Sequence, residues 1–135
     1  MIRLRVYGDP APQGSKRHVG NGRMVEASKK VGPWRKAVSE AVDGLALFEP
    51  LDGPLEVDVT FYVPRPRSVK RMLPHVPPDL DKLLRGLFDA LTIAGVWVDD
   101  SLVVRVYAAE FYADIEPPGC EVSVARVEDL VMAVR

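Results

Sequence analysis

A proline-rich segment near the middle of the chain sets the strongest limit on its fold. Residues 64–78 include five prolines. Each proline lacks a backbone N–H donor and restricts the residue before it, so neither a helix nor a central strand can run through this segment. We therefore predict a loop. It is longer than most connections between elements, which favours a functional role for it.

Regular elements are predicted on both sides of this loop. Residues 55–63 alternate apolar and polar side chains, which is typical of a β-strand. After the loop, an apolar stripe at helical spacing predicts a helix that begins at Asp79 or Leu80 and ends at Gly95. The other predicted elements are a helix over 33–47 and strands over 2–7, 23–26, 96–98, 102–112 and 120–127. We expect one α+β (mixed α/β) domain over residues 1–135, with a small mixed sheet packed against two main helices.

Charge is unevenly distributed along a chain whose net charge is only −1. Residues 1–36 carry nine bases and two acids, residues 63–75 carry four bases and no acid, and residues 76–135 carry five bases and eleven acids. Such blocks predict separate charged surfaces and keep nucleic acid open as a ligand. No apolar run reaches the ~18 residues of a membrane span, and no signal peptide is recognisable, so we expect no membrane partner. The single cysteine, Cys120, excludes an internal disulfide and a cysteine-based zinc site, and the chain is expected to be intracellular (cytoplasmic).

Four aspartates are the strongest candidates for chemistry. Asp79 and Asp81 begin the second helix, and Asp99 and Asp100 follow about 20 residues later. Mg²⁺ prefers carboxylate oxygens, and metal-assisted cleavage of a phosphodiester needs several carboxylates in one place. An extended approach after Pro78 would let Asp79 and Asp81 point the same way, and residues 96–98 could return Asp100 to them. Helix capping and an ordinary turn explain the same residues without a metal, and both explanations stay open.

Two basic segments could contact phosphates. The first is a Gly/Pro-rich loop with Lys16, Arg17 and Arg23, and the second is the proline-rich loop with Arg65, Arg67, Lys70 and Arg71. The first lacks the Walker A spacing, and no dinucleotide fingerprint is present, so we expect no nucleotide cofactor. A solvated loop is the alternative for each segment. On the second helix, Arg85 lies one turn after Asp81, where it could form an exposed ion-pair ladder or serve the candidate site.

A longer motif now joins these residues. Residues 79–91 read D-L-D-K-L-L-R-G-L-F-D-A-L, and residues 95–104 read G-V-W-V-D-D-S-L-V-V. This run resembles the RusA family of Holliday junction resolvases, in which a D-L-D-N-L-x-K-x-x-x-D-A-L core precedes a D-D-x-x-I/V-V signature. The first strand, basic loop, first helix and following strand fit the family more loosely.

The resemblance implies a Mg²⁺- or Mn²⁺-dependent endonuclease that acts as a homodimer on four-way DNA junctions, in recombination and repair. The essential aspartates of the family correspond to Asp79, Asp81 and Asp100, as metal ligands. Its basic catalytic lysine corresponds to Arg85, and its usual asparagine to Lys82, which we add to the DNA-binding candidates. An arginine stays charged, so phosphate or transition-state stabilisation fits Arg85 better than proton transfer.

Three other functions stay open. They are a nuclease on other branched or flapped DNA, a junction-binding protein without catalysis, and a small-molecule phosphohydrolase. For a junction enzyme, the basic segments should flank the Asp79, Asp81 and Asp100 cluster on one face of the fold.

Overall fold

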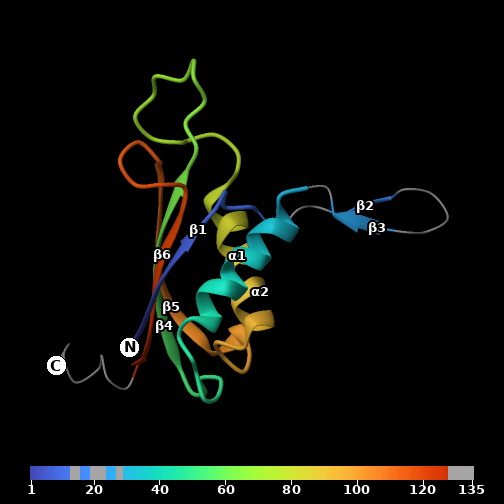
Figure 1. Cartoon of the computed structure of the whole chain (residues 1–135), viewed down its shortest axis with the longest axis vertical. Coiled ribbons are helices and arrows are strands. Elements are labelled where there is room, and N and C mark those ends of the chain that lie inside the picture. Colours follow the sequence, from blue (N-terminus) through green and yellow to red (C-terminus); the bar gives the residue numbers. More distant parts are fainter. Residues whose placement is uncertain (13–15, 19–23, 27–28, 128–135) are drawn as a thin grey trace.

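The fold centres on a four-stranded sheet with the strand order β1–β6–β4–β5 (Figure 1). The computed structural model describes residues 1–12, 16–18, 24–26 and 29–127. The sheet strands are β1 (Ile2–Tyr7), β4 (Leu55–Val63), β5 (Val103–Tyr112) and β6 (Gly119–Arg126). β6 runs antiparallel to β1 and β4, whereas β4 and β5 are parallel. A parallel pair needs a crossover connection, and the proline-rich loop and the second helix provide it.

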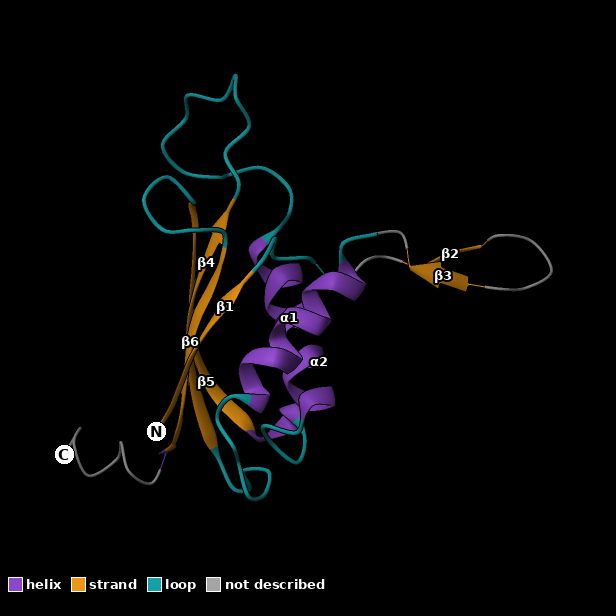
Figure 2. Cartoon of the chain, in the orientation of Figure 1, coloured by secondary structure: helices purple, strands orange, loops and turns teal. Residues whose placement is uncertain are grey.

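Two helices cover one face of this sheet (Figure 2). They are α1 (Val31–Asp43) and α2 (Leu80–Ala94), which pack against each other. A short 3₁₀ helix, η1 (Asp100–Leu102), precedes β5. The strands β2 (Lys16–His18) and β3 (Met24–Glu26) form a separate two-stranded hairpin. The predicted α+β class, with a mixed sheet against two helices, is confirmed.

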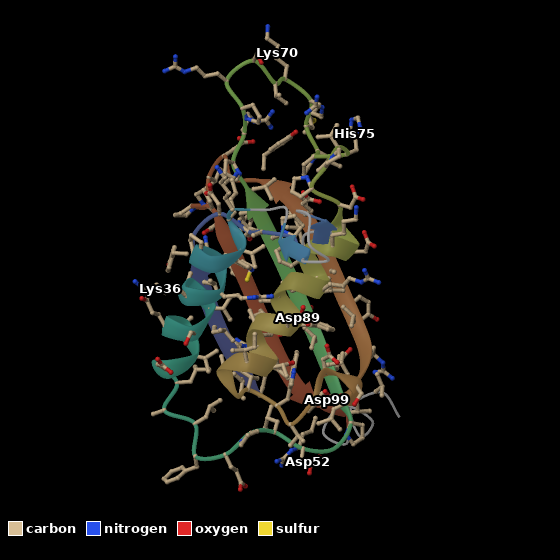
Figure 3. The ribbon with its side chains drawn as sticks, turned by 90° about the vertical axis from the view of Figure 1, so that its right-hand side faces the viewer. Lys36, Asp52, Lys70, His75, Asp89 and Asp99 are labelled. Atoms are coloured by element: carbon tan, nitrogen blue, oxygen red, sulfur yellow. The ribbon has the colours of Figure 1, made fainter. Side chains whose placement is uncertain are left out.

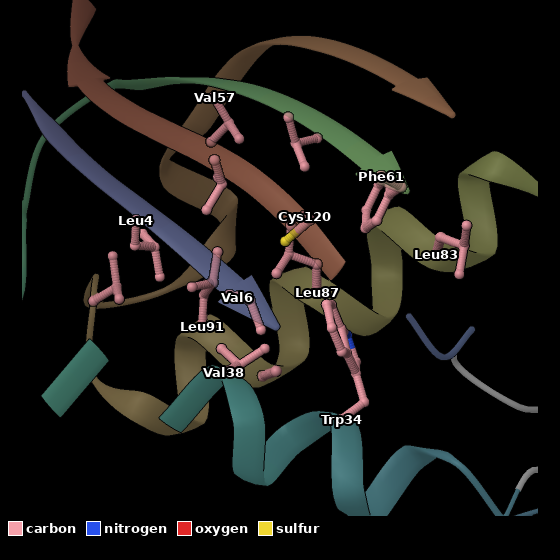
Figure 4. Close-up of a cluster of buried hydrophobic side chains, with 14 of the residues drawn as sticks. Leu4, Val6, Trp34, Val38, Val57, Phe61, Leu83, Leu87, Leu91 and Cys120 are labelled. Atoms are coloured by element: carbon pink, nitrogen blue, oxygen red, sulfur yellow. The ribbon is translucent and has the colours of Figure 1, made fainter. Parts of the chain in front are cut away.

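The core fills the space between the sheet and the two helices (Figure 4). Alternate residues of β4, from Leu55 to Phe61, are at most 1% exposed, as the sequence alternation predicts. Trp34 from α1 and Leu87 from α2 meet this face of the sheet at 2% and 0% exposure. Full burial of one such side chain contributes about 1.5–3 kcal/mol, so α2 is held in a fixed position on the sheet. The backbone of its first turn, to which Asp81 belongs, is therefore held in a fixed position as well.

Several element boundaries differ from the prediction. α2 begins and ends as predicted, and Gly95 closes it in the left-handed conformation (φ 85°). α1 ends at Asp43, four residues before the predicted end, and β2 was not predicted. The predicted strand over residues 96–98 is wrong, because Trp97 forms only one isolated bridge, with Leu51. The Trp97 indole instead packs edge-on against Phe88 and donates a hydrogen bond to Thr92 Oγ1 (2.7 Å).

In the part of the chain that the structure describes, neither α1 nor α2 has the length and apolar character of a membrane-spanning helix. Gly119, at the start of β6, has φ +146°, and a Cβ there would clash with the backbone oxygen of Val6. Only glycine fits this position, where β1 and β6 approach each other closely.

Candidate nucleic-acid interface and metal site

Asp79 stands at the point where the proline-rich loop enters α2. Its backbone is extended (φ −71°, ψ 141°), and its side chain makes no capping hydrogen bond to the helix. The carboxylate lies 3.6 Å from Lys82 Nζ, and both side chains are about half exposed. Asp81 is exposed in the first turn of α2. The extended backbone agrees with our prediction for Asp79, whereas capping does not account for its side chain.

Asp100 lies at the other end of the structure. It opens η1, beyond the C-terminal end of α2, whereas Asp79 precedes the first residue of that helix. A helix of 15 residues spans about 22 Å. Figure 3 shows the neighbouring Asp99 in the lower part of the view and His75, four residues before Asp79, in the upper part. The expectation that residues 96–98 return Asp100 to the other aspartates within one chain is therefore wrong, because α2 runs straight and η1 stays at its far end.

Glu110 on β5 is a carboxylate that sequence reasoning missed. The parallel register pairs it with the buried Phe61, so its side chain points to the helix-covered side of the sheet. Burial, and then the negative charge of Asp79, raise the pKa of Glu110 from 4.5 to about 7. The side chain is only partly buried, yet its Oε2 atom is enclosed and has no hydrogen-bond partner among the described residues. The one available signal was a glutamate in a mostly apolar strand, where Arg105 is the other charged residue.

The proline-rich loop is fastened at its base by Arg65. The Arg65 guanidinium donates to both carboxylate oxygens of Asp114 (2.7 and 2.9 Å) and to the carbonyl oxygens of Val69 (3.1 Å) and Arg71 (2.7 Å). It also stacks on the ring of Tyr112, 4.2 Å from the centroid. The hydrogen bonds from Arg65 lower the pKa of Asp114. Arg65 therefore orders the loop, a role that its assignment as a DNA contact did not include.

The other predicted DNA contacts divide into three groups. Arg71 donates to Tyr112 Oη (2.8 Å) and so also supports the loop. Arg67, Lys70 and Lys82 are exposed, as is the predicted catalytic residue Arg85, and Figure 3 shows Lys70 at the outer end of the loop. Lys16 and Arg17 belong to β2, of which only the backbone is described, and Arg23 lies outside the described residues. The proline-rich loop thus lies at the Asp79 end of the molecule and away from Asp100, so it flanks only part of the predicted cluster.

A cavity of about 450 Å³ separates the loop from the first turn of α2. Leu73, Val76 and Pro77 of the loop line it together with His75, Asp79 and Glu110. Two carboxylates therefore share one cavity wall with apolar side chains. Among the described residues, no three potential metal ligands gather closely enough within one chain to hold an ion by themselves. The donors present still suit a hard divalent cation that takes few protein ligands and keeps several waters, since Asp79 and Glu110 repel each other and Glu110 Oε2 lacks a partner.

Comparisons with known proteins identify the family of this chain. The chain is 30% identical over 140 residues to the uncharacterized protein YqaN of Bacillus subtilis (strain 168), covering 93% of this chain and 96% of that protein. The family model described as Endodeoxyribonuclease RusA matches residues 8–125, which begin just after β1 and include β2 to β5, both helices, most of β6 and Asp79, Asp81 and Asp100. With this match over most of its length, the chain belongs to the RusA family of endodeoxyribonucleases, the Holliday junction resolvases.

Proposed function

We propose that this chain is a divalent-metal-dependent endonuclease that resolves four-way DNA junctions by paired symmetric nicks, acting as a homodimer. The observation that carries the proposal is the position of Asp79, whose carboxylate is not used in capping and which lies beside Glu110 and an ordered basic loop. Family membership supports the junction as the substrate class.

Each chain would contribute carboxylates at both ends of α2: Asp79 and Asp81 at the start of the helix, and Asp100 beyond its end. Asp79 and Asp81, with Glu110 nearby, would hold Mg²⁺ or Mn²⁺, which when bound neutralises phosphate charge and lowers the pKa of a bound water. Lys82, 3.6 Å from Asp79, would balance part of the negative charge. Arg85 is exposed one turn after Asp81, where its guanidinium would stabilise charge that develops on the cleaved phosphate.

The distance between Asp79 and Asp100 gives the dimer a specific role. If both carboxylates act on one phosphate, they must come from different chains, because about 22 Å of helix separates them within one. A two-fold axis that pairs the α2–β5 sides in opposite directions would bring the partner subunit's Asp100 to Asp79, and the reverse. β5 is an edge strand of the sheet, and exposed apolar residues occur on α2, on the connection after it and on β5, namely Ile93, Val98 and Val106. Two such sites match the two cuts that a junction requires.

A single substitution tests the metal site. Asp81→Asn should abolish cleavage of a four-way junction in Mg²⁺ while junction binding stays within about twofold, since the backbone contacts that dominate affinity are elsewhere. The matched control is Asp43→Asn, at the exposed end of α1, which should cut like the wild type. Full cleavage by Asp81→Asn would refute the site.

Mixed dimers test the shared site. Co-expressed Asp81→Asn and Asp100→Asn chains should regain one working site in each mixed dimer, because one chain keeps Asp79 and Asp81 and the other keeps Asp100. Single nicks would then appear although neither variant cuts alone. Mixed dimers that form but do not nick would refute the shared site. Parallel assays on a flap and a plain duplex compare the junction with other branched substrates, and binding without cleavage in Mg²⁺ and Mn²⁺ would indicate a binding protein.

A further inference from the structure

The cavity beside Asp79 combines features that a metal site alone does not require. Its loop wall is apolar, formed by Leu73, Val76 and Pro77, although the loop also carries Arg67 and Lys70. Leu73 is 52% exposed and Val76 39% exposed, and the adjacent Met72 is 86% exposed. These three apolar side chains lie within five residues and are exposed to water, so they contribute little of the stabilisation that burial would give. The stability of the fold therefore does not explain why they are on the surface of the loop.

The loop that carries these side chains is ordered before any ligand arrives. Arg65 holds its base through four hydrogen bonds, Arg71 donates to Tyr112, and Pro74 is buried. Within the loop, the Leu73 carbonyl accepts a hydrogen bond from the His75 backbone N–H (2.9 Å). A ligand that fills the cavity therefore pays little to order the wall, which is the condition for a preformed site.

The charges around the cavity select the kind of ligand. Asp79 and Glu110 line the cavity where the proposed cation and the phosphate to be cut would lie, so the remaining space, walled by apolar side chains, suits an uncharged group. Arg67 and Lys70, exposed on the same loop, attract a polyanion to the outside. A neutral, flat, largely apolar group attached to a polyanion satisfies both conditions, and in DNA that group is the nucleobase.

We propose that this cavity holds a nucleobase that has left its stack at the branch point, next to the phosphate cut at Asp79. This inference rests on the proposed function and extends it to how a branch is distinguished from a duplex. Bases at a branch are already partly unstacked, so they enter at low cost, whereas a base in an intact duplex must first be extracted. Leu73, Val76 and Pro77 would contact the faces of the base, and His75 lies where it can meet its polar edge.

Fluorescence of 2-aminopurine, which rises when the base leaves its stack, tests the proposal. The probe is placed at each position around the branch point of a four-way junction, and binding is measured in EDTA so that no cutting occurs. Wild type should raise the fluorescence at one or two positions next to the cut. Leu73→Ser with Val76→Ser should lose that rise and bind the junction about tenfold more weakly, the cost of about one stacked base. Leu73→Ala alone should show part of the loss.

The control is Phe48→Ser, which removes a fully exposed aromatic ring from a loop outside this cavity. It should behave like the wild type. If wild type cuts junctions but raises fluorescence at no position, or if the double variant keeps the rise, the base pocket is refuted and the proposed function stands. If wild type neither binds nor cuts junctions, the proposed function fails and the pocket fails with it.

Discussion

Replacing Glu110 by glutamine should stabilise the fold at alkaline pH and not at acid pH. The pKa of Glu110 is raised to about 7 in the folded chain, against 4.5 ordinarily. Between these values the folded state holds a proton that the unfolded state has released, so the free energy of unfolding falls as pH rises. The cost of this carboxylate is therefore absent below about pH 4.5 and complete above about pH 7.

The size of the effect follows from the same values. At about 1.4 kcal/mol per pKa unit, the difference has a ceiling of about 3 kcal/mol. Because Glu110 is only partly buried, water screens much of this, and we expect about 1 kcal/mol. Glu110→Gln keeps the shape and cannot ionise, so it should gain that amount at pH 8, or about 3 °C in Tm. Asp79→Asn removes the repelling charge and should recover a smaller part.

Urea unfolding in EDTA at pH 4.5 and pH 8 measures this difference. The quantity compared is the unfolding free energy of the variant minus that of the wild type, since other carboxylates titrate in both proteins. The exposed Glu49, changed to Gln, is the control and should show no dependence on pH. A Glu110→Gln difference that is the same at both pH values would refute the assigned burial of this side chain and its proximity to Asp79.

Two further changes test the scaffold that positions the site. Arg65→Lys keeps the charge but loses the two-pronged bond to Asp114, so trypsin should cut the loop at Arg67, Lys70 or Arg71 several times faster than in the wild type. Asp114→Asn should have the same effect. A wild-type rate of proteolysis in both variants would show that this bond does not order the loop. Gly119→Ala places a Cβ against the Val6 carbonyl and should cost about 3 kcal/mol or more in chemical denaturation. Gly32→Ala, in open space on α1, should change stability by about 1 kcal/mol at most, and equal effects of the two would contradict the close approach of β1 and β6.

Local patterns predicted the elements well where one face is buried. The alternation in residues 55–63 and the stripe from Leu80 to Leu91 correspond to β4 and α2, because each packs one face against the same core. Residues 96–98 misled the prediction, since three apolar residues suit a strand while Trp97 is held by contacts with Phe88 and Thr92. No pattern within three residues can encode such contacts.

The site was predicted only in part, because its geometry depends on distant pairings. The sequence marked Asp79 and Asp81 correctly as a feature of the start of α2, but it could not show that Asp100 stays at the far end. Glu110 lies in a strand without alternation, so only its pairing with Phe61 reveals which side it faces. Arg65 was assigned to DNA because its partner, Asp114, is 49 residues away.

The fixed length of α2 would set the distance between the two cleavage sites of the proposed dimer. Asp79 comes just before the first residue of this helix, and Asp100 follows its last residue. The 15 residues of the helix therefore fix the distance between the two carboxylates of one chain. In the dimer, the two nicking sites would then lie about one helix length apart, roughly 22 Å. A helix packed on the sheet cannot lengthen when DNA binds, so the arms of the junction would have to bend until the two phosphates match this spacing. Substrate deformation, more than protein movement, would decide which junctions can be cut on both strands.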